Sequence, residues 1–410
     1  MSSALLLRAY QNKRGGRKWT PPCSWSHPDT PRDHIGIFDA LNRRTTDRGR
    51  NSVMQPVAPR GLPVLSLDRT TLSLPKLSAP SSWLPQLASC SGTAEKLLGL
   101  LTSSAVRKCS LENMQFPRCR MDMLRAIERR VRADKPVQLT LMAFPFKVPN
   151  PAKVGPRHMP DLAELAALLQ MYKLHLKAKS IYPPGLEIHI IHDGSYIANV
   201  FGVSLEEVRA YERYFSRLVG ALGEKDFIHV HDLEALSQPA GFTNLGQQAA
   251  RLRNSIRCWL GNAQETKEWR ERFSKTLGMI NLRDLPAREV SCLLLHAASG
   301  RLPSEYCDLE RQVRIAMLRY CLRDSLLHML DPRPACFPDA IHVTTQCRPC
   351  RLAIWMVSRG RSLLPWHGVG VIDRAGKWGV ELARDVLWNP SYTPFFLDGE
   401  DTPFCYFQDA

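Results

Sequence analysis

Two short apolar runs, each followed by a helical pattern, constrain the fold of this chain more than any other feature. Residues 137–144 (VQLTLMAF) and 186–192 (LEIHIIH) have the length and apolar content of buried strands. A helix is expected to begin at Asp161 after the first run, and Ser204 with Glu207 forms a capping box that opens a helix after the second. This alternation of strand and helix predicts a sheet covered by helices.

The rest of the chain adds helices in its middle and strands near its end. Helical patterns occupy residues 93–107, 121–132, 244–261, 265–278, 285–299 and 304–329, and a third, shorter strand is expected at 227–230. Strand patterns return at 340–345, 351–357, 368–372 and 378–382, with the turn sequence DRAGK between the last two. The expected fold class is α/β, a Rossmann-like mixed sheet flanked by helices that gains antiparallel strands late in the chain.

The first part of the chain has a different composition. Residues 1–90 are rich in Pro, Ser, Arg and Thr, and residues 62–87 show neither helical nor strand periodicity. We therefore expect a basic, disordered tail at 1–90 and a single α/β catalytic domain at 91–410. The acid-free, arginine-bearing start could alternatively be a mitochondrial presequence, although it lacks a clear amphipathic helix.

The charge and cysteine content limit the cellular setting and the partners. A formal charge of +16 suits an anionic partner, which could be nucleic acid, an acidic membrane surface or a phosphorylated metabolite. The 12 cysteines in 410 residues are too few and too irregular for a disulfide scaffold. No secretory signal and no run of about 20 apolar residues is present. We expect a cytoplasmic protein that does not span a membrane.

Two groups of residues resemble metal sites without completing one. Cys347 and Cys350 form a C-x-x-C between two expected strands, where no helix follows and no second ligand pair is evident, so ordinary turn cysteines are expected. Several histidines lie on expected strands, where partly buried positions are commoner than metal ligation: His189, His192, His229 and His231. No metal and no cofactor is expected.

The loop between the first strand and its helix is the most informative segment. It reads FPFKVPNPAKVGPRHMPDLAE over residues 144–164. Its position places it at the carboxyl edge of the sheet, where ligands usually bind. Its prolines stiffen it, and Lys147, Lys153, Arg157 and His158 make it cationic. It suits a phosphate-bearing substrate, and the alternative is a solvated basic loop before a helix.

The spacing of this loop resembles the pyoverdine/dityrosine biosynthesis family of isocyanide (isonitrile) synthases. The shared pattern is F-P-F-K-x-P-N-x-x-K, followed by P-D-x-x-E, and further resemblances are YPPG at 182–185, Arg323 with Ser325, and PWH at 365–367. The chain departs from the family at residues 341–346, where the expected arginine and histidine are absent or displaced. The family's following lysine is represented only by Arg351.

The resemblance implies an enzyme of specialised metabolism that converts the amino group of tyrosine or tryptophan to an isocyanide. The carbon would come from ribulose 5-phosphate, and a downstream oxygenase could use the product. Proton transfer is expected from Glu164 or His367, because the amine must be deprotonated and the imine isomerised. Substrate binding is expected from the remaining motif residues, with the two lysines on the phosphate or ketone and Asp161 on the ammonium: Lys147, Asn150, Lys153, Asp161, Asp193 and Arg323.

Two alternatives to this enzyme stay open. One is a divergent, inactive family member that acts as a scaffold, since the changed strand at 341–346 could abolish turnover. The other is a basic nucleic-acid-binding protein, which the charge favours. The sequence lacks zinc or helix-turn-helix signatures and basic strands with interleaved aromatics, so nucleic acid is the less favoured partner.

Overall fold

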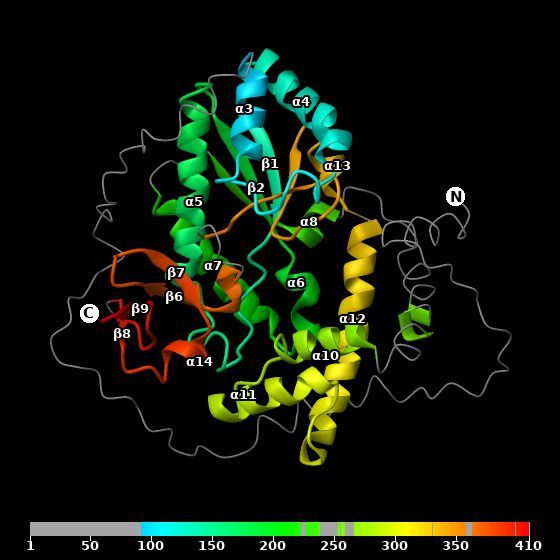
Figure 1. Ribbon diagram of the computed structural model, residues 1–410, viewed down its shortest axis with the longest axis vertical. Coiled ribbons are helices and arrows are strands. Elements are labelled where there is room, and N and C mark those ends of the chain that lie inside the picture. The colour runs from blue at the N-terminus through cyan, green and yellow to red at the C-terminus, as the bar shows by residue number, and fades with distance from the viewer. Residues whose placement is uncertain are drawn as a thin grey trace, which may run out of the picture. The chain divides into compact units, whose positions relative to one another are not determined.

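The computed structural model describes residues 92–222, 227–237, 253–254, 256–258, 266–329, 331–357, 363–397 and 399–409 of the chain. The expected tail at 1–90 and most of the helix expected at 244–261 lie outside these residues. The described part contains two β-sheets and the helices that cover them (Figure 1).

The first sheet has five parallel strands in the order β3-β2-β1-β4-β5. They are β1 (Val137–Met142), β2 (Leu186–His192), β3 (Ile228–Asp232), β4 (Ile341–Thr344) and β5 (Leu352–Ala353). The predicted α/β fold, with a sheet flanked by helices, is confirmed, and all five strands of this sheet are parallel. The order reverses beside β1, since β2 and β4 lie on its two sides, and the carboxyl ends of strands at such a reversal are the usual place for a ligand.

Helices on this sheet begin where the capping boxes predicted. Asp161 caps α5 (Leu162–Lys179) and Ser204 caps α7 (Leu205–Gly220). In each case the glutamate three residues on accepts a hydrogen bond from the backbone nitrogen of the capping residue. Helix α5 is apolar on nearly all sides and lies between the first sheet and the strands of the second, which explains its extensive burial. Helix α3 (Thr93–Thr102) packs on α4 (Phe116–Arg132), which contacts β1.

The late strands form a separate sheet rather than an extension of the first. Its order is β7-β6-β9-β8, with β6 (Val369–Ile372), β7 (Trp378–Glu381), β8 (Tyr392–Phe395) and β9 (Cys405–Gln408). The expected hairpin at residues 373–377 is confirmed, because β6 and β7 pair antiparallel across it. The late antiparallel strands predicted from the sequence are therefore present, although they lie in this second sheet. Strands β4 and β5 instead join the first sheet in parallel.

The second sheet sits directly on the start of α5. A Cβ added to Gly370 would come within 2.5 Å of the Leu162 Cβ and 2.7 Å of the Ala163 nitrogen. The glycine therefore permits an approach that no larger residue allows. This contact brings β6 to the loop at residues 144–164.

A group of longer helices lies beyond the carboxyl ends of the first sheet (Figure 1). It comprises α10 (Lys267–Leu277), α11 (Ala287–His296) and α12 (Cys307–Met329), and α10 packs on α12. Short helices complete the connections: α6 (Gly194–Ile197), α8 (Leu233–Ser237), α13 (Arg333–Cys336) and α14 (Ala383–Val386). Every described helix is too short or too polar to cross a bilayer.

The C-x-x-C segment is tied to the N-terminal helices. Cys347 forms a disulfide with Cys109, which lies between α3 and α4. The expectation of ordinary turn cysteines was therefore wrong for Cys347. A partner so distant in sequence could not be identified from spacing. The bond anchors the connection between β4 and β5.

Candidate active site

A cavity opens at the point where the strand order reverses. Four residues at the end of β1 and just after it line the cavity, namely Met142, Ala143, Pro145 and Phe146. Asp193 after β2 and residues 344–346 at the end of β4 also line it. Helices α10 and α12 and the turn at Pro365–His367 close its other sides. It has about 180 Å³ of space for water-sized groups, roughly tenfold more than a single water needs. The cavity can therefore hold a small organic molecule.

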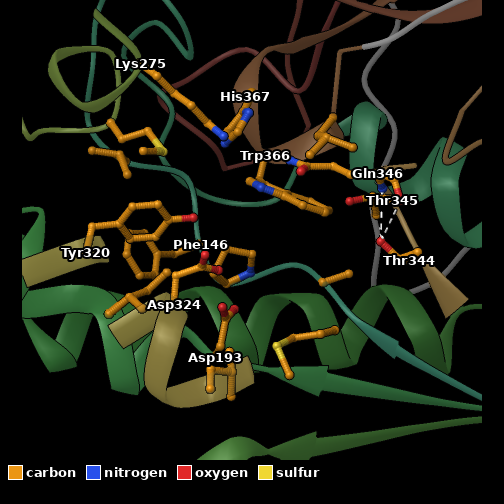
Figure 2. A pocket seen from close by; sticks show the side chains of 18 of the residues that line it. Phe146, Asp193, Lys275, Tyr320, Asp324, Thr344, Thr345, Gln346, Trp366 and His367 are labelled. Atoms are coloured by element: carbon orange, nitrogen blue, oxygen red, sulfur yellow. Dashed lines mark hydrogen bonds between the residues drawn. The ribbon is translucent and has the colours of Figure 1, made fainter. Parts of the chain in front are cut away.

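Acidic groups lie on one side of this cavity. Asp193 follows β2, and Asp324 comes from α12. Burial raises the pKa of Asp193 to about 6, and the nearby charge of Asp324 contributes in the same direction. Figure 2 shows both side chains beneath Phe146, with Tyr320 beside them. A cationic group bound here would relieve the repulsion between the two carboxylates.

Cationic groups and a histidine lie on the opposite side of the cavity (Figure 2). Lys275 of α10 and His367 line the cavity. Burial lowers the pKa of His367 well below 6.5, and the charges of Lys153 and Lys275 lower it further. Burial likewise lowers the pKa of Lys153 to about 8. His367 is therefore a neutral imidazole at pH 7, able to accept a proton or a hydrogen bond.

Arginines form a further part of the cavity wall. Arg333 comes from α13, and Arg348 and Arg351 come from the connection between β4 and β5. The disulfide at Cys347 lies within the same connection. The cavity thus joins acidic, basic and aromatic groups, which suits a substrate that carries both signs of charge.

Lys147, Asp161 and Glu164 form a buried network beside the cavity. The Lys147 ammonium lies 2.6 Å from Asp161 and 3.1 Å from Glu164, and it donates to the Gly368 carbonyl at 3.0 Å. Tyr211 donates to the other oxygen of Glu164 at 3.1 Å. Burial raises the pKa of Glu164, and the Lys147 charge opposes that rise. None of these side chains lines the cavity.

The other residues predicted for the site are divided between loop, helix and cavity. Asn150 is buried, accepts from the Ala152 nitrogen and donates to the Gly278 carbonyl, so it orders the loop. Arg323 lies over the ring of Tyr196, at 5.1 Å from its centroid. Lys153 is near the cavity but does not line it. Of the predicted site residues, Asp193 and His367 line the cavity.

Several cavity residues were missed by sequence reasoning. Lys275, Tyr320, Asp324 and Arg333 come from helices whose approach to the sheet depends on tertiary packing. One signal was available for Asp324, because it follows Arg323 in the segment that resembles the family. Arg351, noted as a replacement for a family lysine, does line the cavity. No local pattern distinguished Lys275 or Arg333.

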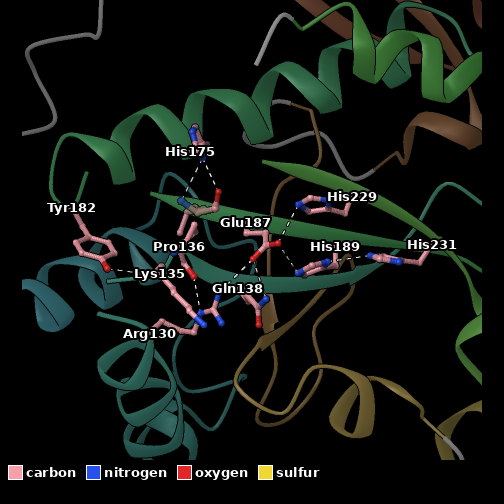
Figure 3. A network of polar contacts seen from close by, with 11 residues as sticks. Arg130, Lys135, Pro136, Gln138, His175, Tyr182, Glu187, His189, His229 and His231 are labelled. Carbon is pink, nitrogen blue, oxygen red and sulfur yellow. Dashed lines mark hydrogen bonds and ion pairs between the residues drawn. The ribbon is translucent and has the colours of Figure 1, made fainter. Parts of the chain in front are cut away.

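A second polar cluster lies on one face of the first sheet (Figure 3), and none of its residues lines the cavity. Glu187 accepts from Gln138 at 2.9 Å and lies 3.1 Å from Nε2 of His229. Nδ1 of His189 lies 3.0 Å from Nε2 of His231. The described residues contain no group of three or more His, Cys, Asp or Glu side chains arranged for a metal ion.

The chain matches a known protein family over much of its helical and sheet core. Residues 127–320 match the family described as pyoverdine/dityrosine biosynthesis protein. The chain is 32% identical over 246 residues to the L-tyrosine isonitrile synthase of Xenorhabdus nematophila, which covers 58% of this chain and 69% of that protein. It is 30% identical over 134 residues to the L-tryptophan isonitrile synthase AmbI2 of Fischerella ambigua, 33% of this chain and 40% of the relative.

A solved structure shows the same fold. The crystal structure of the PvcA protein from Pseudomonas aeruginosa matches with a TM-score of 0.56 at 21% identity, over 77% of this chain and 99% of that one. At this identity the likeness concerns the arrangement of the backbone. It supports the α/β architecture described above.

Proposed function

The chain belongs to the pyoverdine/dityrosine biosynthesis family, and from this premise we propose that it is an isocyanide synthase. Its substrate in this proposal is an aromatic amino acid, tyrosine or tryptophan, whose amino group becomes the isocyanide. Ribulose 5-phosphate supplies the carbon. The observation that carries the proposal is the cavity at the strand reversal, where carboxylates face cationic groups across an aromatic middle.

The acidic side of the cavity suits the amino group of the substrate. Burial is the main cause of the raised Asp193 pKa, and the charge of Asp324 adds to it; an ammonium bound between the two carboxylates would offset both effects. Phe146 and Trp366 lie between this side and the cationic side (Figure 2). Their rings offer an apolar surface on which an aromatic side chain can pack.

The cationic side suits the sugar phosphate and its ketone. The amine must lose a proton before it attacks the ketone, and protons must move again as the imine isomerises. His367 is the favoured group for these transfers, because it lines the cavity and its lowered pKa keeps the imidazole neutral. Lys275, supported by Lys153, would stabilise negative charge that develops on the ketone oxygen.

A structural role fits Lys147 and Glu164 better than direct chemistry. Lys147 already contacts Asp161, Glu164 and the Gly368 carbonyl, and the network does not line the cavity. We propose that it holds the PWH turn and β6 against the start of α5. The phosphate contact predicted for Lys147, the ammonium contact predicted for Asp161 and the proton transfer predicted for Glu164 stay predictions.

Direct assay tests the proposal. Purified protein is incubated with ribulose 5-phosphate and either tyrosine or tryptophan, and isocyanide is sought by mass spectrometry. The proposal expects an isocyanide from one of these amino acids, which a downstream oxygenase could then modify. Binding of both substrates without turnover would contradict it and favour the inactive scaffold.

A further inference from the structure

A carboxylate holds two arginines side by side in the cavity wall. Asp331 accepts from Nε and Nη2 of Arg333 at 2.8 and 2.6 Å, and from the Arg333 backbone nitrogen at 3.1 Å. The same carboxylate accepts from Nη2 of Arg351 at 3.1 Å. The Arg333 and Asp331 side chains are only 6% and 11% exposed. The multiple contacts fix the guanidinium plane of Arg333, and the single contact holds the Arg351 guanidinium beside it.

This group carries a surplus of positive charge. The arginine contacts lower the pKa of Asp331 to about 2, so one carboxylate faces two guanidiniums at neutral pH. The neighbouring His342 stays neutral, because burial and the Arg333 charge lower its pKa to about 4. Arg348 adds a further positive charge near Arg351. Like charges held together in a partly buried wall would be stabilised by an anion from the cavity.

Donors remain for such an anion. The contacts with Asp331 use Nε and Nη2 of Arg333 and Nη2 of Arg351, and within the described residues no acceptor meets Nη1 of either side chain. Both arginines line the cavity. Guanidinium groups match the oxygen spacing of carboxylates and phosphates, so two adjacent groups suit one oxyanion.

The position of Arg351 is fixed from a second direction. Its backbone nitrogen donates to the Arg348 carbonyl at 3.3 Å, and the Cys350 nitrogen donates to the Met114 carbonyl at 2.8 Å. The Cys109–Cys347 disulfide ties the same connection to the α3–α4 segment. A donor pair arranged before the ligand arrives loses little freedom on binding.

We propose that Arg333 and Arg351 form an oxyanion-binding subsite of the cavity and that Asp331 is its positioning residue. The ligand group is a carboxylate or a phosphate monoester. The two possible sources, the carboxylate of the amino acid and the phosphate of the sugar, rest on the proposed function. Asp331 acts through the arginines and does not touch the ligand.

The test uses calorimetry on the full chain with Asp331→Asn and Arg351→Gln. Tyrosine is compared with tyramine, which lacks the carboxylate, and ribulose 5-phosphate is compared with ribulose, which lacks the phosphate. Asp339→Asn is the matched control, because Asp339 also holds an arginine, Arg129, at the protein surface. Arg351→Gln keeps the Arg333–Asp331 pair, so it remains informative if Asp331→Asn does not fold.

The expected result is a loss of affinity of roughly 10–100-fold for one anionic ligand in both variants, the range for a charge-assisted hydrogen bond. Binding of the two analogues that lack the oxyanion, tyramine and ribulose, should be the same in the variants as in the wild type, and Asp339→Asn should bind every ligand as the wild type does. Asp331→Asn is the sharper variant, since it adds net positive charge. A simple charge effect would tighten anion binding, whereas loss of positioning weakens it.

The ligand that loses affinity identifies the source of the anion. Unchanged or tighter binding of both ligands that carry the oxyanion would overturn the subsite, as would an equal loss of affinity for tyramine and ribulose. Isocyanide formation with unaltered anion binding in both variants would refute the subsite and leave the proposed function intact. If the variants bind the anion more weakly but the wild type forms no isocyanide, the subsite is supported and the proposed function is refuted.

Discussion

The ammonium of Lys147 lies 2.6 Å from Oδ2 of Asp161 in the interior of the protein, and both side chains are almost fully buried. Lys147→Met would leave Asp161 and Glu164 without their cation. We expect a loss of about 3–5 kcal/mol in the free energy of unfolding, the usual cost of breaking a buried ion pair. Denaturant unfolding measures it.

Lys153→Met is the matched control in the same loop. Lys153 has cationic neighbours, Lys275 and Arg384, so its removal relieves repulsion and should change stability far less. Equal stability of Lys147→Met and the wild type would contradict the structural role of Lys147. A selective loss of ribulose 5-phosphate binding in a stable Lys147→Met would restore its predicted phosphate contact.

The pKa of Asp193 predicts a pH dependence of amino-acid binding. The carboxylate ionises with a pKa of about 6, so its attraction for an ammonium should grow as the pH rises from 5 to 7.5. Asp193→Asn should weaken tyrosine or tryptophan binding at pH 7.5 by roughly 10-fold or more and abolish this dependence. The analogue without the amino group should bind equally at all these pH values.

The same pKa predicts the direction of a stability change. The folded pKa exceeds the ordinary value of 3.8. Asp193 therefore favours the folded state at low pH, and this contribution is lost as the pH rises through about 6. Between pH 3.8 and about 6 the free energy of unfolding of Asp193→Asn should therefore rise relative to that of the wild type. If the difference in unfolding free energy between the two proteins stays constant from pH 4 to 7, this effect is excluded.

His367 is predicted to move a proton. His367→Asn should lower turnover by roughly 10²–10⁴-fold while substrate affinity and melting temperature change little. Because its pKa lies well below 6.5, turnover at saturating substrate should show no titration of this group between pH 6.5 and 8. Wild-type turnover in the variant would end the catalytic role. The proton transfer would then be sought at Glu164.

The region before the described core is predicted to be dispensable. Residues 1–90 lack the apolar periodicity of core elements, and the first described helix, α3, begins at Thr93. Deleting them should leave the melting temperature nearly unchanged. A drop of several degrees would show that the expected boundary near residue 90 is misplaced.

Much of the first sheet could be predicted because its signals are local. The strand at 186–192 has the bounds that its apolar run indicated, and α5 and α7 begin at their capping boxes. Strands β8 and β9 were missed, since they lie in a segment with Pro394 and many polar residues that gives no clear alternation. Their pairing with β6 and with each other depends on contacts distant in sequence.

The candidate site was predictable only where a residue stands beside a predicted strand. Asp193 follows β2 and His367 precedes β6, and both line the cavity. From the sequence, Lys147 was expected to be an exposed cation of the loop, because lysine is almost never buried unless it is paired. Its partners became visible only when α5 and β6 were brought together. The arginines at 333 and 351 meet through Asp331, which sequence spacing does not indicate.

Isotope labelling tests the central claim most directly. Purified protein is given ribulose 5-phosphate labelled with ¹³C at its ketone carbon, together with ¹⁵N-labelled tyrosine or tryptophan. The account predicts an isocyanide that carries both labels in one C–N unit, and its formation should fall sharply with His367→Asn. No isocyanide, or an isocyanide without the ¹³C label, would contradict the proposed reaction.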